Sequence, residues 1–445
     1  MIEADKITST DPSNGQVVGQ VAITPVAAIG PIVQKAHEAQ KLWRQKSAKE
    51  RIAYIKAATE KAATQAEALT ELLCREMGKD YRRASGEVSG ATSGAAYIAQ
   101  EVMEALKPEK QYGTTIEYAP LGVVAVISPW NYPLMMAVNL LVPALVAGNT
   151  VVFKPSEETP LVAQAYVDVL NEFLPENVLQ IIHGDATQGK ALVEANVNMV
   201  AFTGSRAAGK DIMRRAANGV KRLVLELGGN DAMIVLNDAD LPSAARFAVA
   251  SSFENAGQMC TSTERIYVDE TVAQQFQEQV VAIAATYNTG PWNQPNVNIG
   301  PIINDRQRSK IIAHIDDARA KGAQVLLGGG QHPDHYITPT VLAGVSHDTL
   351  MEQEETFGPV VSISTFKTVP EAISRANNSP YGLGGVVFGK KDARQVASQL
   401  EAGMVGINKG PGSGGGPWVG AKQSGFGYHG TASGHRQFAQ VKVIA

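Results

Sequence analysis

The sequence predicts an α/β protein with two parallel-sheet domains and a small β-ribbon, and three observations support this prediction. Short β-branched runs that are apolar throughout begin at Gly122 and are separated by helical stretches. A second alternation of strands and helices begins after about Asp240. The length of 445 residues exceeds what a single ordinary core accommodates. Strands that are apolar on both faces are typical of parallel sheets covered by helices on each side.

The part of the chain before these strands is predicted to be helical, over residues 31–108. An apolar stripe at helical spacing covers 69–77, and Gly78 is predicted to end that helix. Cys74 lies beside this stripe, and we interpret it as a small buried thiol without a chemical role.

Two sets of strands follow from the apolar runs. The first set is predicted at 123–127, 150–153, 178–182, 199–203, 222–227 and 232–236. The second set is predicted near 265–268, 324–327, 360–366, 384–389 and 403–407, between helices at 243–257, 270–286, 305–321, 370–377 and 391–402.

Two further segments, 111–122 and the C-terminal "FAQVKVIA", are expected to be strands outside the main sheets. Lone strands need partners, and another subunit could supply them. The Gly-rich and Pro-rich stretch 408–420 is expected to be a loop of the kind that often lines active sites.

Composition excludes several classes of protein. The net charge is -4, and no cluster of Lys and Arg with interleaved aromatic residues is present, so a nucleic-acid partner is not expected. No run of about 18 apolar residues is present, so no membrane span is expected. Two distant cysteines favour a reducing compartment, and 1–12 lacks the apolar core of a signal peptide, so a cytoplasmic location is expected.

Two residues stand out as candidates for covalent chemistry. Cys260 follows Gly-Gln-Met among small and polar residues, a context that suits an accessible thiol at a loop–helix junction. Taken alone, a lone cysteine is more often a buried structural thiol. Glu226 stands in an otherwise apolar strand beside Gly228 and Gly229, where a carboxylate could act as a general base. The alternative is a strand-end glutamate that points to solvent.

Asn131 lies just after a predicted strand, between two prolines that stiffen the turn. Its amide could donate a hydrogen bond to a developing oxyanion, or it could simply satisfy turn backbone. Polar residues at the carboxyl end of strand 150–153 could contact a ribose, because ligands of parallel sheets bind at those ends. Gly204 and Ser205, at a strand-to-helix turn, could bind phosphate.

Taken together and in order, these segments resemble the aldehyde dehydrogenase superfamily over essentially the whole chain. The resemblance rests on Pro-Trp-Asn-Tyr-Pro, Lys-Pro-Ser-Glu, Phe-Thr-Gly-Ser, Glu-Leu-Gly-Gly, Gly-Gln-x-Cys and Glu-Glu-x-Phe-Gly-Pro. It implies two Rossmann-like α/β domains and an oligomerisation ribbon in a homodimer or homotetramer. It assigns 1–110 and 123–228 to an NAD(P)-binding domain, 229–407 to a catalytic domain that carries Cys260, and 111–122 with 421–445 to the ribbon.

The resemblance also implies a mechanism. Cys260 is expected to attack the aldehyde, giving a thiohemiacetal and then a thioester. Asn131 and the Cys260 backbone N–H are expected to hold the oxyanion, and Glu226 to activate the water that hydrolyses the thioester. The residues implied in cofactor binding are Ser128, Pro129, Trp130, Lys154, Ser156, Glu157, Gly204, Ser205, Leu227, Glu355 and Phe357, and no metal site is implied.

The cofactor is expected to be NAD in preference to NADP, because a carboxylate at Glu157 favours free ribose hydroxyls and repels a 2′-phosphate. Many members have Lys at the positions of Asn230 and Leu140, and the departure at Leu140 puts a proton relay to the base in doubt. The role of these departures stays open.

The expected substrate is succinate semialdehyde or another small aldehyde. Some members that bind that carboxylate place Arg where this chain has Asn139, which weakens the semialdehyde interpretation. An apolar tunnel of Met135, Met136, Met259 and Trp418 makes a neutral aldehyde equally plausible. Two other functions are considered, a CoA-acylating aldehyde dehydrogenase and a non-catalytic structural relative; the first generally lacks the base, and the second tends to lose the nucleophile.

Overall fold

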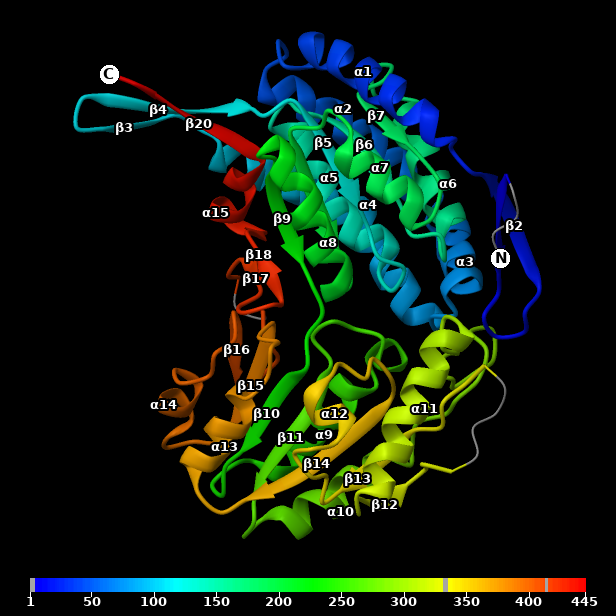
Figure 1. The fold of residues 1–445 in the computed structure, drawn as a ribbon, viewed down its shortest axis with the longest axis vertical. Helices are drawn as coiled ribbons and strands as arrows, with labels where there is room; N and C mark the ends of the chain where they lie inside the picture. The colour runs from blue at the N-terminus through cyan, green and yellow to red at the C-terminus, as the bar shows by residue number, and fades with distance from the viewer. Residues whose placement is uncertain (1–4, 331–334, 413–414) are drawn as a thin grey trace.

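The computed structural model describes residues 5–330, 335–412 and 415–445. Two β-sheets, each covered by helices, lie one above the other in Figure 1, and a narrow ribbon projects from the upper part. The chain passes between the sheets after strand β9 (Arg222–Glu226) and enters the second at β10 (Asp231–Val235). The predicted α/β class is therefore confirmed.

The first sheet has the order β18-β9-β8-β5-β6-β7, and its strands are parallel apart from the antiparallel pair β18–β9. Its predicted strands agree with the structure to within one residue at each end. Beside β9, they are β5 (Val123–Ile127), β6 (Thr150–Lys154), β7 (Leu179–Ile181) and β8 (Met199–Thr203), with β18 (Gly425–Phe426) added from the C-terminal segment.

Eight helices pack with this sheet in the described chain. Helix α3 ends where the sequence predicts: Gly78 has φ 80°, and its N–H donates to the Cys74 carbonyl at 2.8 Å. The helices are α1 (Val26–Trp43), α2 (Ala48–Ala63), α3 (Ala66–Met77), α4 (Tyr81–Ala105), α5 (Pro133–Val146), α6 (Pro160–Asn171), α7 (Ala186–Glu194) and α8 (Arg206–Ala216).

The second sheet has the order β12-β13-β14-β11-β10-β15-β16 and is parallel except for the β12–β13 pair. Strand β13 was not predicted from the sequence. The strands are β11 (Thr263–Asp269), β12 (Gln324–Leu327), β13 (Thr340–Ala343), β14 (Val360–Phe366), β15 (Gly384–Phe388) and β16 (Met404–Ile407), besides β10.

Two predicted helices of this half are shorter than expected. The prediction at 243–257 is wrong beyond Ser252, because Asn255 and Ala256 adopt left-handed conformations with φ 51° and 57°. The helix predicted at 391–402 is only five residues long in the structure. The helices are α9 (Leu241–Ser252), α10 (Ala273–Ala284), α11 (Asp305–Ala320), α12 (Leu350–Gln353), α13 (Val369–Asn377) and α14 (Ala393–Ala397).

The ribbon is built within one chain. Strand β4 (Thr114–Pro120) pairs with β3 (Glu109–Gln111) and, antiparallel, with β20 (Ala439–Ile444), as Figure 1 shows. The partners that these strands need lie within the same chain, since β4 and β20 supply hydrogen bonds to each other. Small elements complete the described fold: β1 (Lys6–Thr10), β2 (Val17–Ala22), β17 (Trp418–Val419), β19 (Tyr428–His429) and α15 (Thr431–His435).

In the part of the chain that the structure describes, no helix is long and apolar enough to cross a membrane.

Candidate active site

Two adjoining cavities lie where the carboxyl ends of β5, β8 and β9 face the second half of the molecule. The larger has a volume of about 590 Å³ and the smaller about 450 Å³. They are continuous, because both are lined by Pro129, Trp130, Thr203, Gly204, Ser205 and Arg306. Ligands of parallel sheets bind at this end of the strands, so the two cavities form the candidate site.

Cys260 lines the larger cavity and is half-buried. It lies in the turn between a short 3-10 helix (Glu254–Gly257) and β11, rather than at the predicted loop–helix junction. The backbone before it is tightly packed, since a Cβ at Gly257 would come within 2.0 Å of the Gly358 carbonyl oxygen. This packing fixes the place of the thiol in the cavity.

Glu226 is the last residue of β9 and lines the same cavity, with a relative exposure of 3%. The alternative of a carboxylate pointing to solvent is therefore wrong. Its Oε1 accepts a hydrogen bond from Trp418 Nε1 at 3.3 Å, and the Cys260 thiol and the Thr203 hydroxyl also act on the carboxylate, whose Oε2 forms no hydrogen bond of ordinary geometry among the described residues. A buried carboxylate oxygen without a donor is costly, which points to a functional role.

Asn131 lies between β5 and α5 and completes the predicted trio in this cavity. One of its two amide hydrogens is engaged, because Nδ2 donates to the Gln258 carbonyl at 2.9 Å. Lys79 holds the backbone of the same residue: its Nζ donates to the Asn131 carbonyl at 2.8 Å. The second amide hydrogen can therefore serve a ligand.

Electrostatics link the thiol to the carboxylates around it. Burial, and then the negative charge of Glu226, Asp231 and Glu355, raise the pKa of Cys260 well above its ordinary value. Burial also raises the pKa of Glu226. The thiol is thus protonated at rest and lies beside a carboxylate that can hold a proton.

The smaller cavity contains the residues predicted to bind the adenosine side of a dinucleotide. Lys154, Ser156 and Glu157 all line it, and Lys154 Nζ lies 3.9 Å from a Glu157 carboxylate oxygen. Gly204 and Ser205 place the N-terminus of α8 at the junction of the two cavities, where backbone N–H groups and the helix dipole favour a pyrophosphate.

The remaining predicted cofactor residues lie on the other wall. Glu355 lines the larger cavity, and its Oε1 accepts the Gly229 N–H at 3.0 Å. Phe357 forms an edge-to-face pair with Trp130, with ring centroids 5.5 Å apart. Leu227 lines the larger cavity and Ser128 the smaller. The structure therefore brings every predicted site residue to these two cavities.

Sequence reasoning missed the residue that shapes this wall. Glu264 accepts the backbone N–H groups of Thr356 and Phe357 at 2.6 and 2.7 Å, and burial raises its pKa to about 8. Strand β11 has the sequence TERIYVD, and Glu264 is one of three charged residues in it, so the sequence did not single it out as it did Glu226. The basic residues Arg306 and Lys310, with Gln307 between them in sequence, also line the larger cavity and were not predicted.

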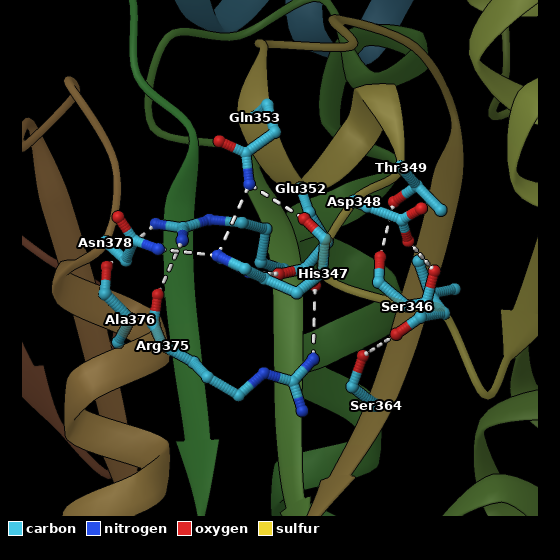
Figure 2. A network of polar contacts seen from close by, with 12 residues as sticks. Ser346, His347, Asp348, Thr349, Glu352, Gln353, Ser364, Arg375, Ala376 and Asn378 are labelled. Carbon is cyan, nitrogen blue, oxygen red and sulfur yellow. Dashed lines mark hydrogen bonds and ion pairs between the residues drawn. The ribbon is translucent and has the colours of Figure 1, made fainter.

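A second buried carboxylate holds the segment just before Glu355. Figure 2 shows Glu352 within a polar network, facing His347 at 3.3 Å and Arg375 at 3.9 Å. Tyr267 donates to Glu352 Oε2 at 2.7 Å from β11. These contacts anchor α12 to the sheet and thereby position the loop that carries Glu355.

The two departures from the usual pattern have structural places. Leu140 is fully buried in the apolar core of α5, so no relay to the base passes through it. Asn230 is buried and donates to the Met351 carbonyl at 3.3 Å. A different lysine, Lys79, is buried close to the site. Its Nζ lies 3.5 Å from the Tyr132 ring centroid and forms an ion pair with Glu87.

Among the described residues, no group of three or more His, Cys, Asp or Glu side chains could hold a metal ion. The lining of the two cavities suits a dinucleotide. Lys154 and Glu157 lie at one end, the N-terminus of α8 lies in the middle, and the Trp130–Phe357 pair lies at the other end.

Comparisons with known proteins agree with this geometry. The model of the Aldehyde dehydrogenase family matches residues 2–444. The glutarate-semialdehyde dehydrogenase of Pseudomonas putida is 34% identical, over 98% of this chain and 94% of its own. Two solved structures superpose with a TM-score of 0.95: an NADP-dependent enzyme of E. coli (33% identical, 99% and 94% covered) and an NAD-dependent aldehyde dehydrogenase of Sinorhizobium meliloti (31%, 99% and 91%).

The fold and these relatives define an NAD(P)-dependent oxidoreductase that acts on aldehydes. The chain belongs to the aldehyde dehydrogenase family.

Proposed function

We propose that this protein oxidises an aldehyde to its carboxylic acid through a thioester on Cys260 that is hydrolysed with the help of Glu226. The observation that supports this most directly is the convergence of Cys260, Asn131 and Glu226 on one cavity. That cavity continues into the one lined by Lys154 and Glu157.

In the first step, Cys260 gives its proton to Glu226, and the sulfur forms a bond to the aldehyde carbon. The carbonyl oxygen becomes an oxyanion, which accepts hydrogen bonds from the second Asn131 amide hydrogen and the Cys260 N–H. Lys154 and Glu157 with the N-terminus of α8 would hold NAD(P), which would supply the hydride acceptor needed to oxidise the carbon bound to Cys260 to the thioester.

In the second step, Glu226 has first released the Cys260 proton to solvent; it then removes a proton from water as the water oxygen attacks the thioester carbon, and it returns this proton to the departing sulfur. The carbon–sulfur bond breaks, the acid leaves, and Cys260 recovers its thiol. A carboxylate whose pKa is raised by burial is a stronger base than an ordinary glutamate, which suits this role.

NAD is the proposed preferred cofactor, because the Glu157 carboxylate lines the smaller cavity beside Lys154 and repels a 2′-phosphate. We expect kcat/KM to be at least about tenfold higher with NAD than with NADP. The Glu157→Gln variant should narrow this ratio. A wild-type preference for NADP would contradict the proposal.

A CoA-acylating activity is the main alternative, and the buried base Glu226 argues against it. Assays with and without CoA distinguish the two, since strict dependence on CoA would favour the alternative. A non-catalytic role is disfavoured by the presence of Cys260 in an accessible cavity.

The substrate is proposed to be a small aldehyde, and semialdehydes belong in the first panel because relatives are named glutarate-semialdehyde and succinate-semialdehyde dehydrogenases. A panel of aldehydes followed at 340 nm with each cofactor tests the activity. Absence of turnover with every aldehyde would refute the proposed function.

We also propose that the protein is a homodimer or homotetramer. Strand β20 lies at the edge of its sheet and exposes Val441, Val443 and Ile444. Such an edge is a ready site for pairing with another chain. Light scattering after size-exclusion chromatography measures the assembly directly.

A further inference from the structure

The larger cavity extends beyond the residues that it shares with the smaller one. This distal part is lined by Tyr132, Met135, Met136, Glu254 and Met259, and it lies next to Cys260. Four of these side chains are apolar or aromatic, whereas Glu254 is acidic. A carboxylate among methionines is an unusual lining for a site expected to receive a semialdehyde acid.

Only one oxygen of Glu254 is engaged in the described structure. Its Oε1 accepts hydrogen bonds from Arg83 Nε at 2.8 Å and from the Tyr132 hydroxyl at 3.0 Å. For Oε2, no hydrogen bond from a described residue is found, and it is not buried, since the side chain keeps 30% of its exposure in the cavity wall. The second oxygen is therefore available to a ligand.

The charge around Glu254 is not balanced. Arg83 also pairs with Asp80 at 2.6 Å, so one cation serves two carboxylates. Lys79 and Glu87 form a separate buried pair that cancels. With all these groups ionised, the cluster carries one net negative charge, and Glu254 is its member on the cavity side.

The cations of the larger cavity lie on its other side. Lys310 acts electrostatically on Glu355 and Glu264, the carboxylates of the cofactor wall. Arg306 belongs to the part shared with the smaller cavity. Neither therefore offsets Glu254 at the distal end.

The position of Glu254 is fixed by its backbone. Asn255 and Ala256, which follow it, have left-handed conformations, and Asn255 Nδ2 donates to the carbonyl oxygens of Asn131 and Gln258. The backbone of Glu254 thus belongs to the same turn as Cys260, and the hydrogen bonds from Arg83 and Tyr132 hold its carboxylate at the cavity.

We propose that Glu254 determines substrate specificity: it selects aldehydes whose far end carries an ammonium group or a hydrogen-bond donor, and it disfavours aldehydes that end in a carboxylate. This inference rests on the proposed function and names its substrate class. Like charges a few ångströms apart in a partly buried site repel enough to change kcat/KM by about tenfold or more.

The test compares three aldehydes that differ in terminal charge: 4-(trimethylammonio)butanal, pentanal and succinate semialdehyde. We expect kcat/KM of the wild-type enzyme to fall in that order, with at least about a tenfold difference between the first and the last. Raising the ionic strength should narrow the difference, because salt screens an exposed charge.

Two variants separate charge from structure. Glu254→Gln keeps the shape and an acceptor oxygen, and it should reduce the ammonium-to-carboxylate ratio of kcat/KM by about tenfold. Glu254→Asp keeps the charge and should preserve the order of the three substrates. The Tm and the Kd for NAD of each variant show whether the fold and the cofactor site are intact.

The possible failures are distinguishable. The inference would be overturned if succinate semialdehyde were the best wild-type substrate. It would also be overturned if neither Glu254→Gln nor salt changed the ammonium-to-carboxylate ratio of kcat/KM. In both cases the oxidation of pentanal would be unaffected. If the Gln variant does not fold, the salt dependence of the wild type decides. A wild-type enzyme that oxidises none of the three aldehydes would instead refute the proposed function.

Discussion

The two cysteines of this chain occupy opposite environments, although burial raises the pKa of both thiols. Cys74 is fully buried on α3 among apolar side chains, and its pKa is raised to about 12. Cys260 lines a cavity, and the carboxylates around it contribute to its shift. A raised thiol pKa therefore does not identify a reactive cysteine; the presence of a base and of space for a ligand does.

The strongest way to break this comparison is to remove each sulfur in turn. Cys260→Ala should lower kcat by about 10⁴-fold or more, because no other group can form the thioester. Cys74→Ala is the matched control: it should retain turnover and lose only about 1 kcal/mol of stability through the lost packing. Aldehyde-dependent absorbance at 340 nm and urea unfolding measure the two effects. Turnover that survives Cys260→Ala would exclude the proposed mechanism.

The role of Glu226 as the base near Cys260 is tested by removing its charge. Glu226→Gln should slow steady-state turnover by about 10² to 10³-fold, because water is no longer activated. Formation of the thioester should slow as well, because Glu226 also takes the Cys260 proton; at high pH, where the thiol ionises without that base, the thioester should accumulate and appear as a covalent mass increase on the protein. Hydroxylamine, a nucleophile that needs little activation, should restore release of the acyl group. Unchanged turnover, or no acyl adduct, would contradict the assignment.

The smallest effect concerns pH. Only the thiolate reacts with iodoacetamide, and the neighbouring carboxylates disfavour it, so inactivation should rise with pH and have its midpoint above the ordinary thiol value of about 8.5. Saturating NAD⁺ should lower this midpoint, since a positive nicotinamide ring favours the thiolate. NADH, whose ring is uncharged, is the control. A midpoint below the ordinary thiol value in the absence of cofactor would contradict the raised pKa of Cys260.

Most of the fold could be predicted because its central strands are continuous apolar runs. Val123–Ile127 and Met199–Thr203 form strands at the predicted bounds. Strand Thr340–Ala343 was missed because Pro339 directly before it and Gly344 directly after it are typical of a loop. The 3-10 turn at Glu254–Gly257 was read as helix, since left-handed Asn255 and Ala256 depend on tertiary packing rather than on local propensity.

The predicted site residues came from short motifs, and those that were missed act through partners distant in sequence. Lys79 contacts the Asn131 carbonyl across 52 positions, and Glu264 contacts the Phe357 N–H across 93. Glu254 meets Arg83 across 171 positions. Sequence spacing carries no signal for such contacts.

Strand β18 has a consequence for the biosynthesis of the enzyme. It pairs with β9 at Glu226. The carbonyl of neighbouring Ser424 accepts the Leu227 N–H at 2.9 Å, and its hydroxyl donates to the Gly228 carbonyl at 2.7 Å. The strand that carries the base is thus completed by residues made about two hundred positions later. A chain that lacks this segment would hold Cys260 without the strand that completes the edge beside Glu226.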